Sequence, residues 1–152
     1  MKREKYQLES DANLFVFEFI SIGPKGKILK LVHYSETNLK GYYNIGFGDK
    51  DEVTGKINDT SITNNGDSQK VLATVVSSLY AFTERHPDAR IYAEGSTDGR
   101  TRLYRIGITK NLSDIKKDFY LFCFDGSQWL EFEEGIKCQA FLIQRKIITF
   151  VK

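Results

Sequence analysis

The sequence predicts an α+β fold with a largely antiparallel sheet, in the element order βββ-α-β-α-βββ. Three observations support this prediction. The 11 Phe and 8 Tyr residues favour a sheet, one segment places apolar residues at helical spacing, and turn signals with Gly, Pro or Asp separate the strand-like segments. We therefore expect one long helix packed across the sheet.

The N-terminal third predicts three strands. Residues 14–22 are rich in aromatic and β-branched side chains and run into Gly23-Pro24-Lys25-Gly26, where proline suits the first corner of a tight turn. Residues 27–34 are the expected partner strand, and residues 42–47 the third. A polar loop is expected over residues 48–65.

The clearest predicted helix lies between residues 65 and 87. Its apolar residues recur at helical spacing and form one continuous face: Val71, Leu72, Val75, Val76, Leu79 and Phe82. Asn65 or Asp67 would cap its start, and Pro87 would end it because proline disfavours helix in the residue before it. A short strand is expected over residues 90–94.

A second helix is predicted to start at Ser96 or Thr97, either of which is a good N-cap. Leu103, Ile106 and Gly107 would then fall near one side of the helix. A strand over residues 102–108 is the competing interpretation, although its alternation of apolar and polar side chains is poor.

The C-terminal part predicts a hairpin and a long strand. Residues 110–117 are polar and form a connection, and Asp125-Gly126 is a strong two-residue turn signal. Glu133-Glu134-Gly135 predicts another turn. The expected strands cover residues 118–124, 128–132 and 138–151.

We expect residues 1–152 to form a single globular α+β domain. A chain of this length buries about two thirds of its unfolded surface, which suffices for a core. Its 41% apolar and 28% charged residues are typical of a folded, soluble protein. No repeat, low-complexity tract or linker divides the chain.

Charge and targeting signals predict a cytoplasmic protein without a membrane span. The 22 basic and 20 acidic residues give a net charge of +2, so no global field favours nucleic acid or membranes. Residues 1–10 are charged and lack the apolar core of a signal peptide. No apolar run approaches the length of a span. Cys123 and Cys138 lie in strand-like runs, which favours reduced thiols over a disulfide.

Four segments together resemble a family of small bacterial proteins that carry a single domain of unknown function. They are residues 17–26, 43–49, 64–67 and 95–105. The resemblance covers nearly the whole chain. It implies a compact bacterial domain, and it carries over no catalytic residue because no activity is assigned to that family.

The segment Gly95–Arg105 is the best candidate for a binding site. Arginines at a helix start face the positive pole of the helix and need a neutralising anion. A glycine after a strand permits a tight turn, hydroxyls add donors, and arginines bind phosphate or carboxylate in a bidentate manner. The candidate anion-binding residues are Ser96, Thr97, Arg100, Arg102 and Arg105.

The helical spacing divides these arginines. Arg102 and Arg105 are three residues apart and share a helix face, whereas Arg100 lies nearly opposite Arg102. The alternative is a structural role, in which the arginines pair with carboxylates of the same chain. The expected partners are Asp49, Asp51, Asp59, Asp67 and Glu94.

Other groups offer weaker chemistry. The two histidines, His33 and His86, and the two cysteines have no zinc-ligand spacing, and we predict no metal and no cofactor. A magnesium site formed by Asp49, Asp51 and Asp59 is an alternative that the sequence leaves open. Tyr42 or Tyr43 is more simply a strand residue than a stacking surface for bases.

These patterns favour a binding module for a phosphate-bearing ligand or nucleic acid. One alternative is a protein-interaction domain with structural arginines. Another alternative is a small RNA-cleaving enzyme in which Tyr104 or His33 moves a proton. It is less favoured because no general base stands at a recognisable spacing. Whether the protein is an enzyme, its ligand and its oligomeric state are left open.

Overall fold

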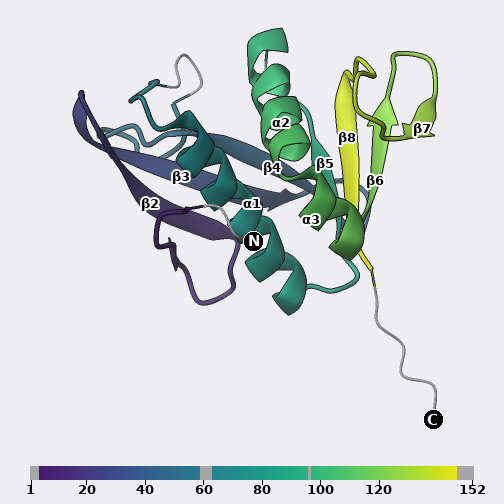
Figure 1. Cartoon of the computed structure of the whole chain (residues 1–152). Coiled ribbons are helices and arrows are strands. Elements are labelled where there is room, and N and C mark those ends of the chain that lie inside the picture. The colour runs from purple at the N-terminus through teal and green to yellow at the C-terminus, as the bar shows by residue number, and fades with distance from the viewer. Residues whose placement is uncertain (1–3, 59–62, 96, 147–152) are drawn as a thin grey trace.

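A mixed sheet organises the chain, and the helices lie over one of its two faces (Figure 1). The computed structural model describes residues 4–58, 63–95 and 97–146. Within these ranges it contains eight strands and three helices, which confirms the predicted α+β class.

The elements follow one another as β1 (Glu9–Ser10), β2 (Val16–Gly23), β3 (Gly26–Glu36), β4 (Tyr42–Asp49), α1 (Ser68–Arg85), β5 (Arg90–Ala93), α2 (Asp98–Lys110), α3 (Leu112–Asp118), β6 (Phe119–Phe124), β7 (Trp129–Glu131) and β8 (Ala140–Arg145).

The strands are ordered β1-β2-β3-β4-β5-β8-β6-β7 in the sheet. Every neighbouring pair is antiparallel except β4 and β5, which are parallel and are connected through α1. The last strand of the chain, β8, therefore lies between β5 and β6. The antiparallel pairing of β5 with β8 brings the end of β5 and the start of β8 to the same end of the sheet.

The core lies between the sheet and α1. Tyr34 of β3 stacks on Phe82 of α1 with ring centroids 4.1 Å apart, and the Tyr34 hydroxyl and the Ser78 hydroxyl lie 2.9 Å apart. Burial raises the pKa of Tyr34 far above its ordinary value. In α2, Gly107 is close to Leu72 of α1, where a Cβ would lie 3.4 Å from the leucine side chain.

The start of α1 confirms the position of Asp67 but not the predicted side-chain cap. Asp67 occupies the N-cap position without a side-chain capping bond. Its carboxylate instead accepts hydrogen bonds from the Tyr6 hydroxyl at 2.5 Å and the Ser21 hydroxyl at 2.6 Å. These contacts connect the N-terminal segment and β2 to the helix start.

A buried ion pair crosses from β3 to β4. Lys30, which is only 1% exposed, donates to the Asp49 carboxylate and to the Thr63 carbonyl at 2.8 Å. The Thr63 backbone N–H donates to the other Asp49 oxygen at 2.9 Å. Burial opposes ionisation of Asp49, but the bonds from Lys30 and Thr63 outweigh burial and lower the pKa of its carboxyl.

Several predicted boundaries need correction. A two-residue strand, β1, precedes β2, and the segment predicted as a polar connection contains α3. This short helix forms because Ile115 is fully buried against the core and the Tyr80 hydroxyl donates to Asp118 at 2.6 Å. The predicted strand over residues 138–151 is β8, and its part beyond Lys146 lies outside the described residues.

The expectation of reduced cysteines is wrong, because Cys123 and Cys138 form a disulfide with their Cα atoms 5.4 Å apart. Cys123 pairs with Phe141 across β6 and β8, and Cys138 comes shortly before that strand. The antiparallel pairing thus brings the sulfurs together. The disulfide removes one argument for a cytoplasmic location, which stays a prediction.

Helices long and apolar enough to span a membrane are absent from the part of the chain that the structure describes.

Candidate functional site

The segment between β5 and α2 is held in place by its own hydroxyl groups. Thr97 is the N-cap of α2, and its side chain accepts a hydrogen bond from the Arg100 backbone N–H at 3.2 Å. The Thr101 hydroxyl accepts from the Gly95 backbone N–H at 3.0 Å. The predicted helix and its Thr97 cap are confirmed, and the competing strand over residues 102–108 is wrong. Ser96 lies outside the described residues.

Gly95 permits this turn because no side chain would fit. A Cβ at Gly95 would lie 2.4 Å from the Thr101 backbone nitrogen and 2.4 Å from the Arg100 Cβ. Contacts this short would force the backbone of α2 to shift. The glycine therefore lets the end of β5 pass directly beneath the first turn of α2.

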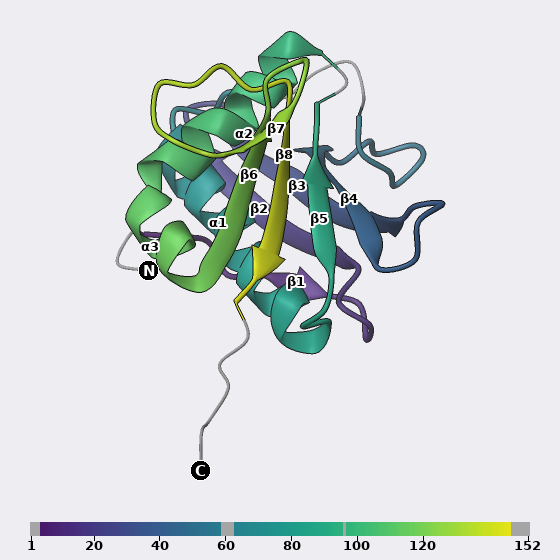
Figure 2. The same ribbon diagram turned by 90° about the vertical axis from the view of Figure 1, so that its right-hand side faces the viewer.

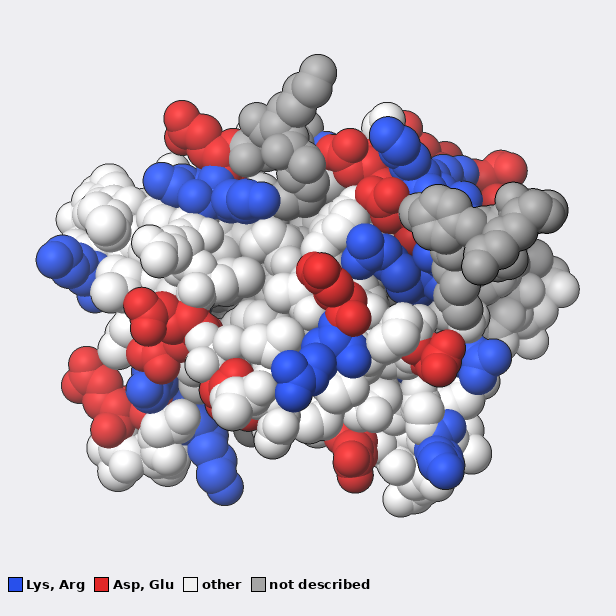
Figure 3. All heavy atoms as spheres, turned by 90° about the horizontal axis from the view of Figure 1, so that it is seen from below, with Lys and Arg blue, Asp and Glu red and all other residues white. Residues whose placement is uncertain are grey.

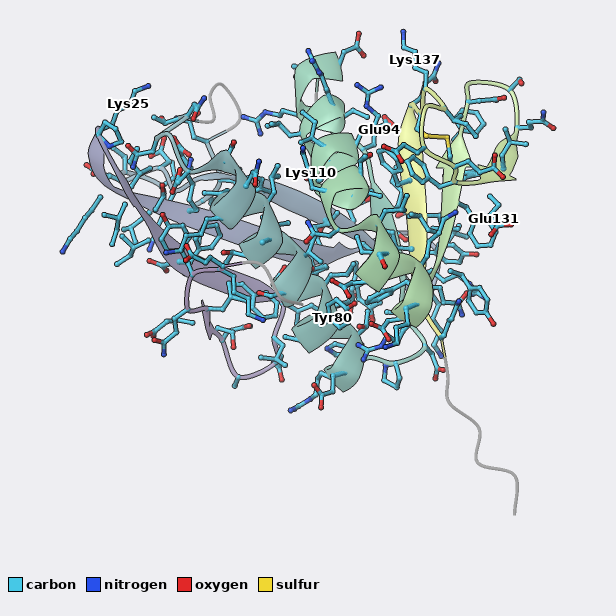
Figure 4. The ribbon with its side chains drawn as sticks, in the orientation of Figure 1. Lys25, Tyr80, Glu94, Lys110, Glu131 and Lys137 are labelled. Carbon is cyan, nitrogen blue, oxygen red and sulfur yellow. A yellow bond between two sulfur atoms is a disulfide. The ribbon has the colours of Figure 1, made fainter. Side chains whose placement is uncertain are left out.

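A pocket of about 530 Å³ opens beside this turn. Three chain segments line it: the end of β5 with the turn after it, the first turns of α2, and the residues that precede β8. The lining residues are Glu94, Gly95, Thr97, Asp98, Thr101, Arg102, Arg105, Lys137, Cys138 and Gln139. Figure 4 shows Lys137 and Glu94 at the end of the sheet where α2 begins.

Three cations from two elements line the pocket. Arg102 and Arg105 come from α2, and Lys137 comes from the segment before β8. Among the described residues, the ion pairs within 4.0 Å are Lys30 with Asp49 and Lys50 with Glu18. In that part of the chain, no carboxylate therefore lies within 4.0 Å of a charged nitrogen of the three pocket cations.

Three of the carboxylates predicted as partners of the arginines have other partners, and a fourth lines the same pocket as Arg102 and Arg105. Asp49 pairs with Lys30, Asp67 accepts from Tyr6, and Asp51 accepts from the backbone N–H groups of residues 53 and 54. Glu94 lines the pocket, and its carboxylate accepts from the Tyr92 hydroxyl at 2.7 Å. Asp59 lies outside the described residues.

Arg100 lies apart from the other two arginines. Its guanidinium donates to the Asn58 carbonyl at 2.8 Å and is close to Gly48, where a Cβ would lie 3.6 Å from Nη1. Arg100 is not among the residues that line the pocket. The opposition of Arg100 and Arg102 expected from helical spacing is thus visible in the structure, and Arg100 connects α2 to the loop after β4.

Carboxylates also border the pocket. Asp98 is in the first turn of α2, where a negative charge suits the helix dipole. Tyr92, whose hydroxyl donates to Glu94, is partly buried, and both burial and the nearby carboxylate raise its pKa to about 12. The pocket is therefore mixed in charge, with cations on α2 and before β8 and carboxylates at the turn.

Sequence reasoning missed Lys137 and Gln139. They are distant from α2 along the chain, and they reach the pocket because β8 pairs with β5. The disulfide then fixes Cys138 between them to Cys123 of β6. A predicted pairing of the two cysteines would have indicated that residues 137–139 lie over β6, but not that β5 is their other neighbour.

The remaining predicted candidates lie in structural positions. The Tyr104 hydroxyl donates to the Ile45 carbonyl at 3.2 Å, and burial raises its pKa to about 12 although Arg100 opposes the shift. Tyr43 packs on Phe82 at 5.2 Å. The His86 ring also contacts Phe82, at 4.7 Å. These groups support the core.

His33 and the described part of the acidic loop lie outside the pocket. His33 is exposed on β3 and does not line the pocket. Among residues 4–58, 63–95 and 97–146, no three His, Cys, Asp or Glu side chains gather closely enough to hold a metal ion.

The chain belongs to DUF6934, a family of unknown function, whose model matches residues 2–146. Among curated proteins and among solved structures, none matches this chain.

Proposed function

We propose that the pocket beside the start of α2 binds a small phosphate-bearing ligand through Arg102 and Arg105, with Lys137 as a third cation. One observation carries this proposal: the three cationic residues line one pocket, and none has an ion-pair partner among the described residues. Cations gathered in this way repel one another, and a bound anion removes the repulsion.

Arginine suits the expected ligand. Its planar guanidinium presents parallel N–H donors that match two oxygens of a phosphate. Arg102 and Arg105 are one helical turn apart, so both can face the same group. The positive pole of α2 adds to their attraction for an anion, although Asp98 offsets part of it.

The carboxylates of the pocket favour a ligand with more than phosphate groups. Glu94 and Asp98 can accept hydrogen bonds from hydroxyl groups, which sugar phosphates and nucleotides carry. A volume of about 530 Å³ lies within the range of small-molecule sites. These features support a small phosphorylated compound as the ligand.

A long nucleic acid is less well supported. A protein that binds a duplex or a long single strand usually presents a basic stripe several phosphates long. Figure 3 shows the side of the molecule away from the pocket, where basic and acidic side chains are interleaved and neither sign forms a continuous field. The net charge of +2 points in the same direction.

Calorimetric titration with a panel of inorganic phosphate, pyrophosphate, sugar phosphates and nucleotides tests the proposal. The double variant Arg102→Gln, Arg105→Gln should weaken binding of the best panel member about a hundredfold or more, since hydrogen bonds from charged groups contribute about 1.5–3 kcal/mol each. The matched control is Arg85→Gln, Lys117→Gln, which removes two exposed positive charges on α1 and α3.

The control should bind as the wild type does. Equal affinities for the wild type and the Arg102→Gln, Arg105→Gln variant would show that the two arginines do not contact the ligand. Equal weakening in both double variants would show a nonspecific charge effect. Either result contradicts the proposed site, provided that thermal unfolding shows both variants to be folded.

A further inference from the structure

A second pocket adjoins the proposed phosphate site along α2. It has a volume of about 240 Å³, and Arg105 lines both pockets. Positions 98, 102, 105 and 109 are three or four residues apart, so they share one face of the helix. Besides Arg105, the second pocket is lined by Ile106, Thr109, Lys110, Phe132, Glu134 and Gly135. The two pockets therefore follow each other along one helix face.

The connection between β7 and β8 forms the opposite wall of both pockets. Its later residues line the first pocket and its earlier residues line the second. In Figure 2, α2 and this connection lie at the same end of the sheet. The Phe132 backbone N–H donates to the Leu121 carbonyl at 3.0 Å, and the Gln139 backbone N–H donates to the Phe124 carbonyl at 2.7 Å. The sheet thus fixes both ends of this wall, and a furrow runs between α2 and residues 132–139.

The two halves of the furrow differ in chemistry. The first pocket has three cations, which suit a phosphate. In the second pocket, Ile106 and Phe132 are the apolar residues of the wall. Lys110 and Glu134 carry opposite charges there, so their attractions for a second phosphate offset each other. The second pocket therefore suits an uncharged group with an apolar face.

We propose that the furrow binds a nucleotide, with its phosphate at Arg102, Arg105 and Lys137 and its base in the second pocket. This ligand class refines the proposed function and rests on it. Arg102 and Thr109 are seven residues apart on α2, which separates the two ends of the furrow by about 10 Å. A ribose joins a phosphate to a base over a separation of this order.

Arg105 and Glu134 favour a nucleotide over a sugar phosphate. Arg105 lines both pockets, and a guanidinium can donate to phosphate oxygens and stack on a flat base. The carboxylate of Glu134 can accept a hydrogen bond from an amino group of the base. A sugar phosphate has neither a flat ring nor such an amino group. The furrow is therefore best matched by a nucleotide whose base carries an amino group.

Calorimetric titration with three probes adds one part of the ligand at a time: inorganic phosphate, ribose 5-phosphate and adenosine monophosphate. The wild type should bind adenosine monophosphate about tenfold more tightly than ribose 5-phosphate, since stacking of one base contributes a factor of this order. The variant Thr109→Trp fills the second pocket with an indole ring. It should remove this tenfold gain and leave the affinity for ribose 5-phosphate at the wild-type value.

The matched control is Ser113→Trp, which places the same ring at an exposed position of α3 outside both pockets. It should bind all three probes as the wild type does. Thermal unfolding shows whether both tryptophan variants are folded.

The exposed Glu134 gives a second test that does not depend on the folding of Thr109→Trp. Inosine monophosphate has a carbonyl oxygen where adenosine monophosphate has its amino group. The wild type should bind the inosine compound about threefold or more weakly, because one hydrogen bond is lost. The variant Glu134→Ala should bind the two nucleotides equally.

Two outcomes would overturn the nucleotide assignment while the phosphate site stands. Adenosine monophosphate binds no more tightly than ribose 5-phosphate, or folded Thr109→Trp keeps the wild-type affinity for adenosine monophosphate. If none of the three probes binds to the wild type, the phosphate site is itself wrong, and the nucleotide assignment fails with it.

Discussion

Lys30 and the pair Arg102 and Arg105 are cations of the same small protein in opposite surroundings. Lys30 is 1% exposed and has both an aspartate and a carbonyl oxygen as partners. Arg102 and Arg105 line an open pocket, and no ion pair of the described residues includes them. Where the chain buries a cation, it also supplies the anion. The open pocket therefore leaves room for an anion from outside.

Breaking the buried pair should produce the largest effect. The variant Lys30→Met leaves the Asp49 carboxylate buried without its partner, which should lower the free energy of unfolding by about 3–5 kcal/mol. Urea denaturation measures the loss. The double variant Lys30→Met, Asp49→Leu should lose less, because it leaves no buried charge. If the single variant were as stable as the wild type, Lys30 would have no structural role.

Removal of the disulfide should have the next largest effect. The variant Cys123→Ala, Cys138→Ala should lose about 3 kcal/mol, since the bond closes a loop with a sequence separation of 15. Phosphate affinity should also fall, because Lys137 and Gln139 flank Cys138 in the pocket. Urea denaturation and calorimetric titration measure the two effects. Unchanged affinity in the folded variant would show that the disulfide is not needed to hold residues 137–139 at the pocket.

Arg100 separates the two kinds of cation within one helix. The variant Arg100→Gln removes a charged hydrogen bond to the Asn58 carbonyl and should cost about 1.5 kcal/mol of stability without changing ligand affinity. The variant Arg102→Gln should lower ligand affinity without changing stability. Thermal unfolding and titration of both variants measure this contrast. Loss of affinity in the Arg100 variant alone would place the anion on the other side of α2.

The smallest expected effect is a pH dependence of stability. The folded pKa of Asp49 lies below its unfolded value of about 3.9, so this carboxylate contributes stability above the unfolded value. The contribution is lost as the pH falls from about 4 through the folded pKa. Urea midpoints between about pH 2.5 and 6 should fall more steeply for the wild type than for Lys30→Met, Asp49→Leu. Parallel curves would contradict this assignment.

Local sequence signals predicted much of the fold. The apolar face of α1, the Thr97 cap of α2 and the turn at Asp125-Gly126 each depend on neighbouring residues, and the structure has all three elements. Local signals failed for α3, because its few apolar residues are stabilised by tertiary contacts of Ile115.

The candidate site was predicted only in part, because its parts come together through the strand order. The spacing on α2 indicated that Arg102 and Arg105 share a face and that Arg100 does not. Lys137 joins them because β8 lies beside β5, and no pattern near residue 137 encodes that pairing. The disulfide could not be predicted from local sequence either, because it depends on the pairing of β6 with β8.

A crystal soaked in selenate tests the anion site most directly, because selenium gives an anomalous signal and selenate resembles a phosphate in shape and charge. We expect an anomalous peak within hydrogen-bond distance of the guanidinium groups of Arg102 and Arg105. Guanidinium groups bonded to carboxylates of the same chain, with selenate bound only elsewhere, would contradict the account.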